Sequence, residues 1–240
     1  MQRYFLLRFN RKVPVSFYRF KGGCSVLSDF YYKILTPTKM ERDKKYPVLF
    51  ALHGIGHSEK DILPAFEGAK EEYILIGVRG HIPHKEGYAY YKLKGYGIPE
   101  REQFDESIIL LKNFIKYACE KYPVDCKRVY IGGFSQGAIL SNSLALVLGD
   151  QVRGIVSLNG YVPTFLDEKF ELKSIDHLSV FLSVGEFDTI FPPEVGKKNY
   201  DYFTNSRATV VYKTYQTGHE ISKENINDIT NWMLNEVQQK

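Results

Sequence analysis

Short apolar runs alternate along the chain with segments in which apolar residues recur at helical spacing. A continuous apolar run of this length is typical of a strand covered on both faces, as in a parallel sheet. The alternation of such runs with helical segments predicts an α/β fold, with a mainly parallel central sheet and helices on both faces. The runs that predict strands occupy residues 48–52, 73–78, 128–131, 152–158, 178–184 and 209–215.

Two segments carry clear helical signals. The first begins near Glu102, is ended by Pro123, and places apolar residues on one face at Phe104, Ile108, Leu111, Ile115 and Ala118. The second is the final helix, for which Ser222 is an N-cap candidate, and Ile221 and Ile226 are placed as a hydrophobic staple. Its expected buried stripe is Ile226, Ile229, Met233 and Val237. By contrast, residues 81–99 show no periodicity and are expected to form a long irregular loop.

The 240 residues are expected to form one α/β domain, with N-terminal strands or an extension over 1–45 and the core of the fold over 46–240. Val26–Leu35 is a further candidate strand. Residues 1–21 carry basic side chains and no acidic one. They are interpreted as solvated faces of edge strands, because Phe5, Leu7 and Phe9 alternate with other residues, or as a basic arm that contacts a membrane surface or an acidic partner.

Composition narrows the function classes. The net charge of +4 is mild and the charges are interspersed, whereas a nucleic-acid-binding protein usually carries a clear basic stripe. There is no apolar run long enough to span a membrane and no convincing signal peptide. The cysteines Cys24, Cys119 and Cys126 are odd in number and include no CxxC pair, which suits a reducing compartment. A cytoplasmic protein with no nucleic-acid partner is therefore expected.

The strongest chemical signal is Gly133-Phe134-Ser135-Gln136-Gly137, which lies between the apolar run 128–131 and a helical run from Ala138. A serine on a sharp turn between a strand and a helix is strained and projects clear of the sheet. The pattern alone also fits an ordinary turn. Its context predicts that Ser135 is a nucleophile.

Asp188 and His219 follow later predicted strands, each just beyond a glycine. The order Ser, Asp, His is that of the α/β-hydrolase fold, and the carboxyl ends of the strands form its functional edge. A neutral imidazole can take the serine proton, and a buried carboxylate fixes the histidine tautomer. Other aspartates follow no comparable strand and turn, so Asp188 and His219 are predicted to complete a catalytic triad with Ser135.

A tetrahedral oxyanion needs N–H donors. The backbone N–H of Gln136 begins the helix beside Ser135, and that of Ile55 lies in the loop after the run 48–52, so both are predicted oxyanion donors. His53 is expected to brace this loop rather than titrate in catalysis. Tyr88, Tyr90 and Tyr91 either form a substrate pocket or cover the edge of the sheet, and both interpretations stay open.

Several motifs together resemble the phospholipase/carboxylesterase family of small α/β-hydrolases. They are Leu52-His53-Gly54-Ile55-Gly56, the Ser135 segment, Gly185-Glu186-Phe187-Asp188 and Gly218-His219-Glu220. The resemblance runs from about Tyr46 to the C-terminus, and 58–61 favours the microbial carboxylesterase branch over the acyl-protein thioesterases. It implies Ser135, Asp188 and His219 as the triad, with oxyanion donors at Ile55 and Gln136.

These residues predict a serine esterase that forms an acyl-enzyme on Ser135, acts on a small ester or acyl substrate, and needs no metal or organic cofactor. Two alternatives remain: a serine peptidase of the same fold, and a non-catalytic binding protein on a hydrolase scaffold. Either a monomer or a homodimer is compatible with the sequence. The physiological substrate, its acyl length and the preference for ester or thioester are not specified.

Overall fold

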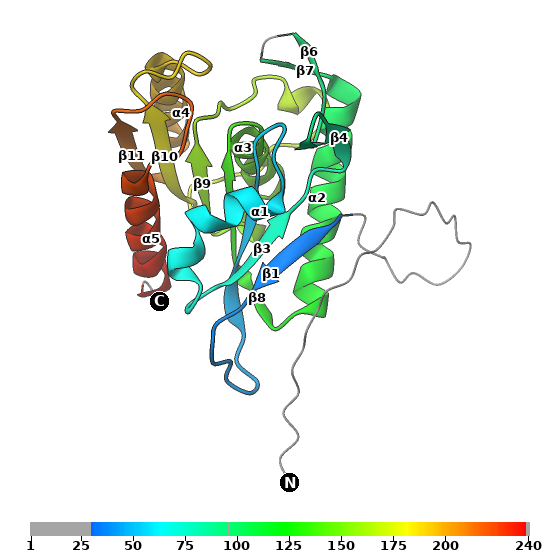
Figure 1. The fold of residues 1–240 in the computed structure, drawn as a ribbon, viewed down its shortest axis with the longest axis vertical. Coiled ribbons are helices and arrows are strands. Elements are labelled where there is room, and N and C mark those ends of the chain that lie inside the picture. Colours follow the sequence, from blue (N-terminus) through cyan, green and yellow to red (C-terminus); the bar gives the residue numbers. More distant parts are fainter. Residues whose placement is uncertain (1–29, 96, 239–240) are drawn as a thin grey trace, which may run out of the picture.

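The computed structural model describes residues 30–95 and 97–238. Its centre is a seven-stranded sheet in the order β1-β3-β2-β8-β9-β10-β11 (Figure 1). Only β1 is antiparallel to its neighbour in this sheet, and the other pairs are parallel, which confirms the predicted sheet. Its strands are β1 (Tyr32–Leu35), β2 (Tyr46–Leu52), β3 (Ile74–Val78), β8 (Val124–Phe134), β9 (Gly154–Leu158), β10 (Ser179–Gly185) and β11 (Thr209–Tyr215).

Helices cover both faces of this sheet, as predicted (Figure 1). One face carries residues of α2 (Arg101–Lys121), α3 (Gln136–Leu148) and α4 (Pro193–Asn205). The other face carries α5 (Lys223–Gln238) and the short helical turns after β2. These turns are α1 (Glu59–Ile62), η1 (Leu63–Ala65) and η2 (Glu67–Ala69). Two further short turns are η3 (Gly149–Gln151) and η4 (Leu166–Glu168).

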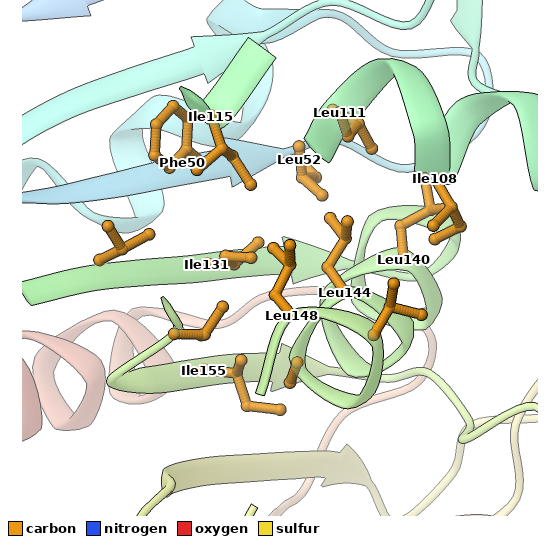
Figure 2. Close-up of a cluster of buried hydrophobic side chains, with 14 of the residues drawn as sticks. Phe50, Leu52, Ile108, Leu111, Ile115, Ile131, Leu140, Leu144, Leu148 and Ile155 are labelled. Carbon is orange, nitrogen blue, oxygen red and sulfur yellow. The ribbon is translucent and has the colours of Figure 1, made fainter. Parts of the chain in front are cut away.

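Alternation along each central strand divides the core in two. On β2, Phe50 and Leu52 belong to the cluster under α2 and α3, whereas Leu49 and Ala51 belong to the cluster under α5. Figure 2 shows the first cluster, where Leu140, Leu144 and Leu148 of α3 and side chains of α2 face the sheet. Burying each large apolar side chain contributes about 1.5–3 kcal/mol, so this two-sided packing fixes the strands that carry the site.

The predicted helix boundaries agree with the structure. Helix α2 starts after Glu100, whose carboxylate accepts a hydrogen bond from the N–H of Gln103 at 3.0 Å, and it ends before Pro123. At the start of α5, the hydroxyl of Ser222 accepts from the N–H of Asn225 at 3.2 Å, which confirms the predicted cap. Of the predicted stripe of α5, Ile229 and Met233 are buried, whereas Ile226 and Val237 are half-buried, and Trp232, which the periodicity analysis omits, is also buried.

Three regions differ from expectation. The stretch 81–99 is not irregular throughout: β4 (Ile82–His84) pairs with β5 (Gly87–Ala89), and β6 (Leu93–Gly95) pairs with β7 (Ile98–Pro99). These strands are too short to produce a periodic pattern. Helix α4 was not predicted, because its sequence is mostly polar and begins with consecutive prolines. The described part of the candidate strand 26–35 is a strand only from Tyr32 onward.

The basic segment 1–21 and Cys24 lie outside the described residues. Within residues 30–95 and 97–238, no helix combines the length and the apolar character that crossing a membrane requires.

Candidate active site

Ser135 occupies a strained turn between β8 and α3. Its backbone has φ 54° and ψ −115°, a conformation that a residue with a side chain rarely adopts and that costs roughly 1–3 kcal/mol. The strain is held by backbone hydrogen bonds on both sides, from Ser135 N to Leu158 O at 2.9 Å and from Ile139 N to Ser135 O at 3.0 Å. The hydroxyl does not cap α3, so it is not occupied by the helix that it precedes.

The glycines on either side of Ser135 are required by close backbone approaches. A Cβ atom on Gly133 would lie 2.3 Å from the carbonyl carbon of Gly137. A Cβ on Gly137 would lie 2.1 Å from the backbone oxygen of Leu52, at the end of β2. Both contacts are with backbone, which cannot turn aside, so only glycine lets α3 begin against the sheet at this point.

Asp188 and His219 meet at the carboxyl ends of β10 and β11. The two strands are parallel, with Gly185 opposite Tyr215, so the loops that follow them leave the sheet side by side. The Oδ2 atom of Asp188 lies 2.8 Å from Nδ1 of His219. The structure thus brings together the predicted acid and base of the triad.

The Asp188 carboxylate is buried and fully hydrogen-bonded. Its Oδ1 accepts from the N–H groups of Ile190 and Phe191 at 2.8 and 2.9 Å, and its Oδ2 accepts from Asn159 Nδ2 at 2.7 Å as well as facing His219. Burial alone raises the pKa of Asp188, but the hydrogen bonds from Asn159 and His219 outweigh it. The net pKa lies below its ordinary value, so the group is an anion at neutral pH.

Aromatic rings hold the imidazole of His219. The ring of Phe134 lies 4.8 Å from the His219 ring, centroid to centroid, and the ring of Phe191 lies 5.6 Å away. Phe134 directly precedes Ser135 in the chain, so its contact brings the imidazole to the serine turn. The same histidine therefore contacts the acid loop and the last residue of the strand that carries the serine.

The oxyanion loop, residues 53–58 between β2 and α1, carries the predicted donor Ile55 and lies against the serine turn. A Cβ on Gly54 would lie 3.5 Å from Cβ of Ser135, so Ile55 follows a residue in direct proximity to the serine. Gln136 occupies the first position of α3, where backbone N–H groups have no partner within the helix. The N–H of Ile55 and that of Gln136 thus belong to two segments that meet at Ser135.

His53 links this loop to the end of β3. Its Nε2 accepts from the N–H of Gly80 at 2.9 Å, which leaves Nδ1 as the atom that donates to Gly54 O at 2.7 Å. Burial lowers the pKa of His53 to about 4, so the ring is neutral at neutral pH. Its contacts are those of a brace between two loops.

The three candidate pocket tyrosines have different environments. Tyr90 and Tyr91 are fully buried, at 0% and 1% exposure, and the hydroxyl of Tyr90 donates to Val78 O at 2.7 Å. Neither ring presents a surface to a substrate, which favours the sheet-covering interpretation for these two. Tyr88 is half-buried, with its ring 4.5 Å from the guanidinium carbon of Arg79.

Sequence reasoning missed several residues that support the site. Asn159, which donates to Asp188, follows β9 in a left-handed conformation with φ 51°. Its position at a strand end just before a glycine was a usable signal. The ion pair of Glu59 and Arg79 gave no such signal, because Glu59 begins α1 and Arg79 follows β3, twenty residues later. Among residues 30–95 and 97–238, no group of three or more His, Cys, Asp and Glu side chains is placed to hold a metal ion.

Comparison with known proteins agrees with this geometry. The family model described as Phospholipase/Carboxylesterase matches residues 37–235. The chain belongs to this family. It is accordingly an α/β-hydrolase and an enzyme of the serine carboxylesterase or thioesterase type.

Individual relatives are distant but cover much of the chain. The chain is 26% identical to the putative hydrolase MhqD of Bacillus subtilis over 185 residues, which is 77% of this chain and 91% of the relative. It is 29% identical to acyl-protein thioesterase 1 homolog 1 of Dictyostelium discoideum over 161 residues, 66% of this chain and 70% of the relative.

Solved structures show the same fold. The Bacillus cereus carboxylesterase superposes with a TM-score of 0.76 at 23% identity, over 86% of this chain and 94% of that structure. A carboxylesterase from Mesorhizobium loti gives a TM-score of 0.74 at 21% identity, over 88% and 98%.

Proposed function

We propose that this family member hydrolyses carboxylic esters, and thioesters of similar shape, through an acyl-enzyme on Ser135. The observation that carries the proposal is the 2.8 Å contact between Asp188 Oδ2 and His219 Nδ1 next to the strained Ser135 turn. An anionic carboxylate on Nδ1 leaves Nε2 of the neutral imidazole as the proton acceptor. A relative named acyl-protein thioesterase supports the inclusion of thioesters.

In the proposed reaction, His219 Nε2 takes the Ser135 proton as Oγ attacks the substrate carbonyl. The resulting oxyanion accepts hydrogen bonds from the N–H groups of Ile55 and Gln136, each of which contributes roughly 10²–10³ in rate. His219 then gives its proton to the leaving alcohol or thiol, and the acyl-enzyme forms. Water, deprotonated by His219, attacks the acyl-enzyme and releases the acid.

The test compares Ser135→Ala with Ser174→Ala, in which an exposed serine away from the turn is replaced. Turnover of short p-nitrophenyl esters is expected to fall about 10⁶-fold in Ser135→Ala and to stay unchanged in Ser174→Ala. A fluorophosphonate probe should label Ser135 in the folded wild type. Retained turnover in Ser135→Ala would remove the assignment, and a folded wild type without labelling would favour the binding-protein alternative.

A substrate panel separates the esterase from a serine peptidase of the same fold. Esters and thioesters of increasing acyl length are compared with p-nitroanilide peptides, with kcat/KM measured for each. If kcat/KM is higher for the peptides than for the esters and thioesters, the protein is a peptidase and the esterase proposal is wrong.

The cellular setting is part of the same proposal. The described cysteines, Cys119 and Cys126, are free thiols, which supports a reducing, cytoplasmic location. The enzyme is expected to act there on a small-molecule substrate, as a monomer or a homodimer.

A further inference from the structure

An ion pair between a buried carboxylate and a partly buried guanidinium adjoins the oxyanion loop. Glu59, the first residue of α1, follows the loop directly, and its side chain is 0% exposed. Arg79, just after β3, donates two hydrogen bonds to this carboxylate, from Nε to Oε2 at 2.6 Å and from Nη2 to Oε1 at 2.8 Å. Burying such a pair is weak evidence for added stability, because desolvation offsets much of the attraction. A planar two-donor contact does, however, fix the relative position of the two segments.

Arg79 also holds Tyr88. The guanidinium carbon lies over two aromatic rings, 3.9 Å from the centroid of Tyr31 and 4.5 Å from that of Tyr88. Its Nη1 donates to the Tyr88 hydroxyl at 3.3 Å. Both the face and the tip of the Tyr88 side chain are therefore set by Arg79.

The backbone of Tyr88 is in turn paired with the oxyanion loop. The N–H of Gly56 donates to Tyr88 O at 2.8 Å, and the N–H of Tyr88 donates to His57 O at 2.9 Å. The approach is close, since a Cβ on Gly87 would lie 2.1 Å from Gly56 O. These bonds fix Gly56 and His57, which directly follow Ile55, and so constrain the turn that carries the Ile55 N–H group.

The next residues of the same segment hold the second donor. The side chain of Gln136 accepts from the N–H of Tyr90 at 2.8 Å and donates from Nε2 to Tyr91 O at 2.8 Å. The Tyr90 carbonyl is further tied to α2 by the Ser107 hydroxyl at 2.6 Å. The segment 88–91 thus contacts the Ile55 loop at one end and Gln136 at the other.

We infer that the segment 88–91, clamped by the Glu59–Arg79 ion pair, sets the spacing of the two oxyanion donors, and that Glu59, Arg79, Tyr88 and the Gln136 side chain are positioning residues. The inference rests on the proposed function. It gives the tyrosines of this segment a role through their backbone and packing, without substrate contact. A donor displaced by a fraction of an ångström stabilises the oxyanion less, while ground-state binding changes little.

The main test removes the ion pair on both sides, in the double variant Glu59→Gln and Arg79→Met, so that no lone charge is left buried. We expect kcat on a p-nitrophenyl ester to fall 10- to 100-fold, on the order of one removed donor or less, with KM within about twofold. The affinity for a trifluoromethyl ketone, whose adduct places an oxyanion at the same position, should fall in parallel. Arg79→Lys, which keeps the charge but loses the fork, should lie between the double variant and the wild type.

The matched control removes a distant ion pair, with Asp125→Asn and Arg128→Met in one chain. Arg128 Nε lies 2.8 Å from Asp125 Oδ2 at the start of β8, the far end of the strand from Ser135. The kcat and the trifluoromethyl ketone affinity of this control should equal those of the wild type.

A second variant, Gln136→Glu, covers the case in which the double variant does not fold. Glutamate can still accept from Tyr90 N but cannot donate to Tyr91 O, and the backbone N–H of residue 136 is retained. We expect kcat to fall several-fold, with KM unchanged and with a parallel loss of trifluoromethyl ketone affinity.

Two failures are distinguishable. A wild type that is neither labelled by fluorophosphonate at Ser135 nor active on the ester overturns the proposed function, and this inference with it. If the wild type is labelled and active, a folded double variant or Gln136→Glu with kcat within twofold of wild type overturns the inference alone. A fall in kcat with unchanged affinity for the trifluoromethyl ketone also overturns it.

Discussion

Asp188 is held by two backbone donors of its own loop and two distant side chains, whereas the oxyanion loop 53–58 is tied to the rest of the site mainly by residues distant in the chain. The acid receives N–H donors from Ile190 and Phe191, a few residues on, and two distant side-chain partners, Asn159 and His219. The loop 53–58 depends on Gly80, Tyr88 and Tyr90, and on the pair of Arg79 with Glu59.

The difference shows that the Asp188 carboxylate and the oxyanion loop are held in place by different kinds of contact. Backbone donors on the acid side come with the turn itself, because Asp188 caps the N–H groups that follow it. The oxyanion side has its own turn, in which the N–H of His57 donates to Gly54 O at 3.2 Å, and it is further ordered by hydrogen bonds to Gly80, Tyr88 and Tyr90 from other segments. The acid side should therefore be sensitive to charge, and the oxyanion side to packing and burial.

The largest expected effect comes from replacing Asp188 itself. In Asp188→Asn the amide oxygen can still accept from Ile190 and Phe191, so the loop should keep its shape. The amide nitrogen would then face Asn159 and His219, which forces the imidazole into the wrong tautomer. We expect kcat on p-nitrophenyl esters to fall on the order of 10⁴-fold. The control is Asp201→Asn, which affects only an exposed pair with Lys197 on α4. A kcat within tenfold of the wild type would exclude Asp188 as the triad acid.

The second expected effect is on stability, which His53 of the oxyanion loop and Asp188 should each change in a different pH range. Burial lowers the pKa of His53 from 6.5 to about 4, so between these values the unfolded chain binds more protons than the folded one. The free energy of unfolding should therefore fall as the pH is lowered from about 6.5 to 4, by on the order of 3 kcal/mol from this group. The pKa of Asp188 is depressed, so its contribution is present above its ordinary pKa of 3.8 and is lost only as the pH falls further.

Urea unfolding at a series of pH values measures whether stability is lost first between pH 6.5 and 4, where His53 titrates, and only below that range through Asp188. His53→Asn should be less stable than the wild type at pH 7 and should have a flatter dependence between pH 6.5 and 4. An unchanged slope in His53→Asn would show that another group titrates in this window.

The smallest expected effect comes from replacing either of two glycines that both have a positive φ. Gly56, in the oxyanion loop, has φ 82°, and Gly97, in the β6–β7 turn, has φ 70°. A Cβ meets no atom within 3.9 Å at Gly56 and none within 4 Å at Gly97, so strain rather than space decides both substitutions. Alanine should cost roughly 1–2 kcal/mol at each position.

Only Gly56→Ala should also lower kcat, several-fold, because the strain falls on the loop that carries Ile55. Gly56→Asn should recover part of the loss, since asparagine tolerates this conformation. Equal kcat values for Gly56→Ala and Gly97→Ala would show that the loop absorbs the strain without moving its donor.

The same contrast explains what could be predicted from the sequence. The serine turn, with its glycines, is a local pattern, and the strands before Asp188 and His219 are strong apolar runs. The sheet and its carboxyl edge were therefore predictable, and with them the neighbourhood of these three residues. Their catalytic roles stay predictions, for which Ser135→Ala and Asp188→Asn are the tests.

The supporting contacts were not predictable, for a physical reason. Arg79 and Glu59 meet because the start of α1 lies beside the end of β3, and the partners of the Gln136 side chain lie more than forty residues away. No spacing rule encodes such contacts. The hairpins in 81–99 were missed for a related reason, since β4 and β5 are stabilised partly by the His57–Tyr88 bridge and not by their own sequence pattern.

The N–H groups that hold Asp188 have a consequence for adaptation. Ile190 contributes its main chain to the carboxylate, while its side chain is 38% exposed, and the neighbouring Phe187 is 63% exposed. Almost any residue can supply the same N–H group. Selection or engineering can therefore vary the side chains at 187 and 190 beside the predicted catalytic acid, while the Asp188 carboxylate keeps its backbone hydrogen bonds.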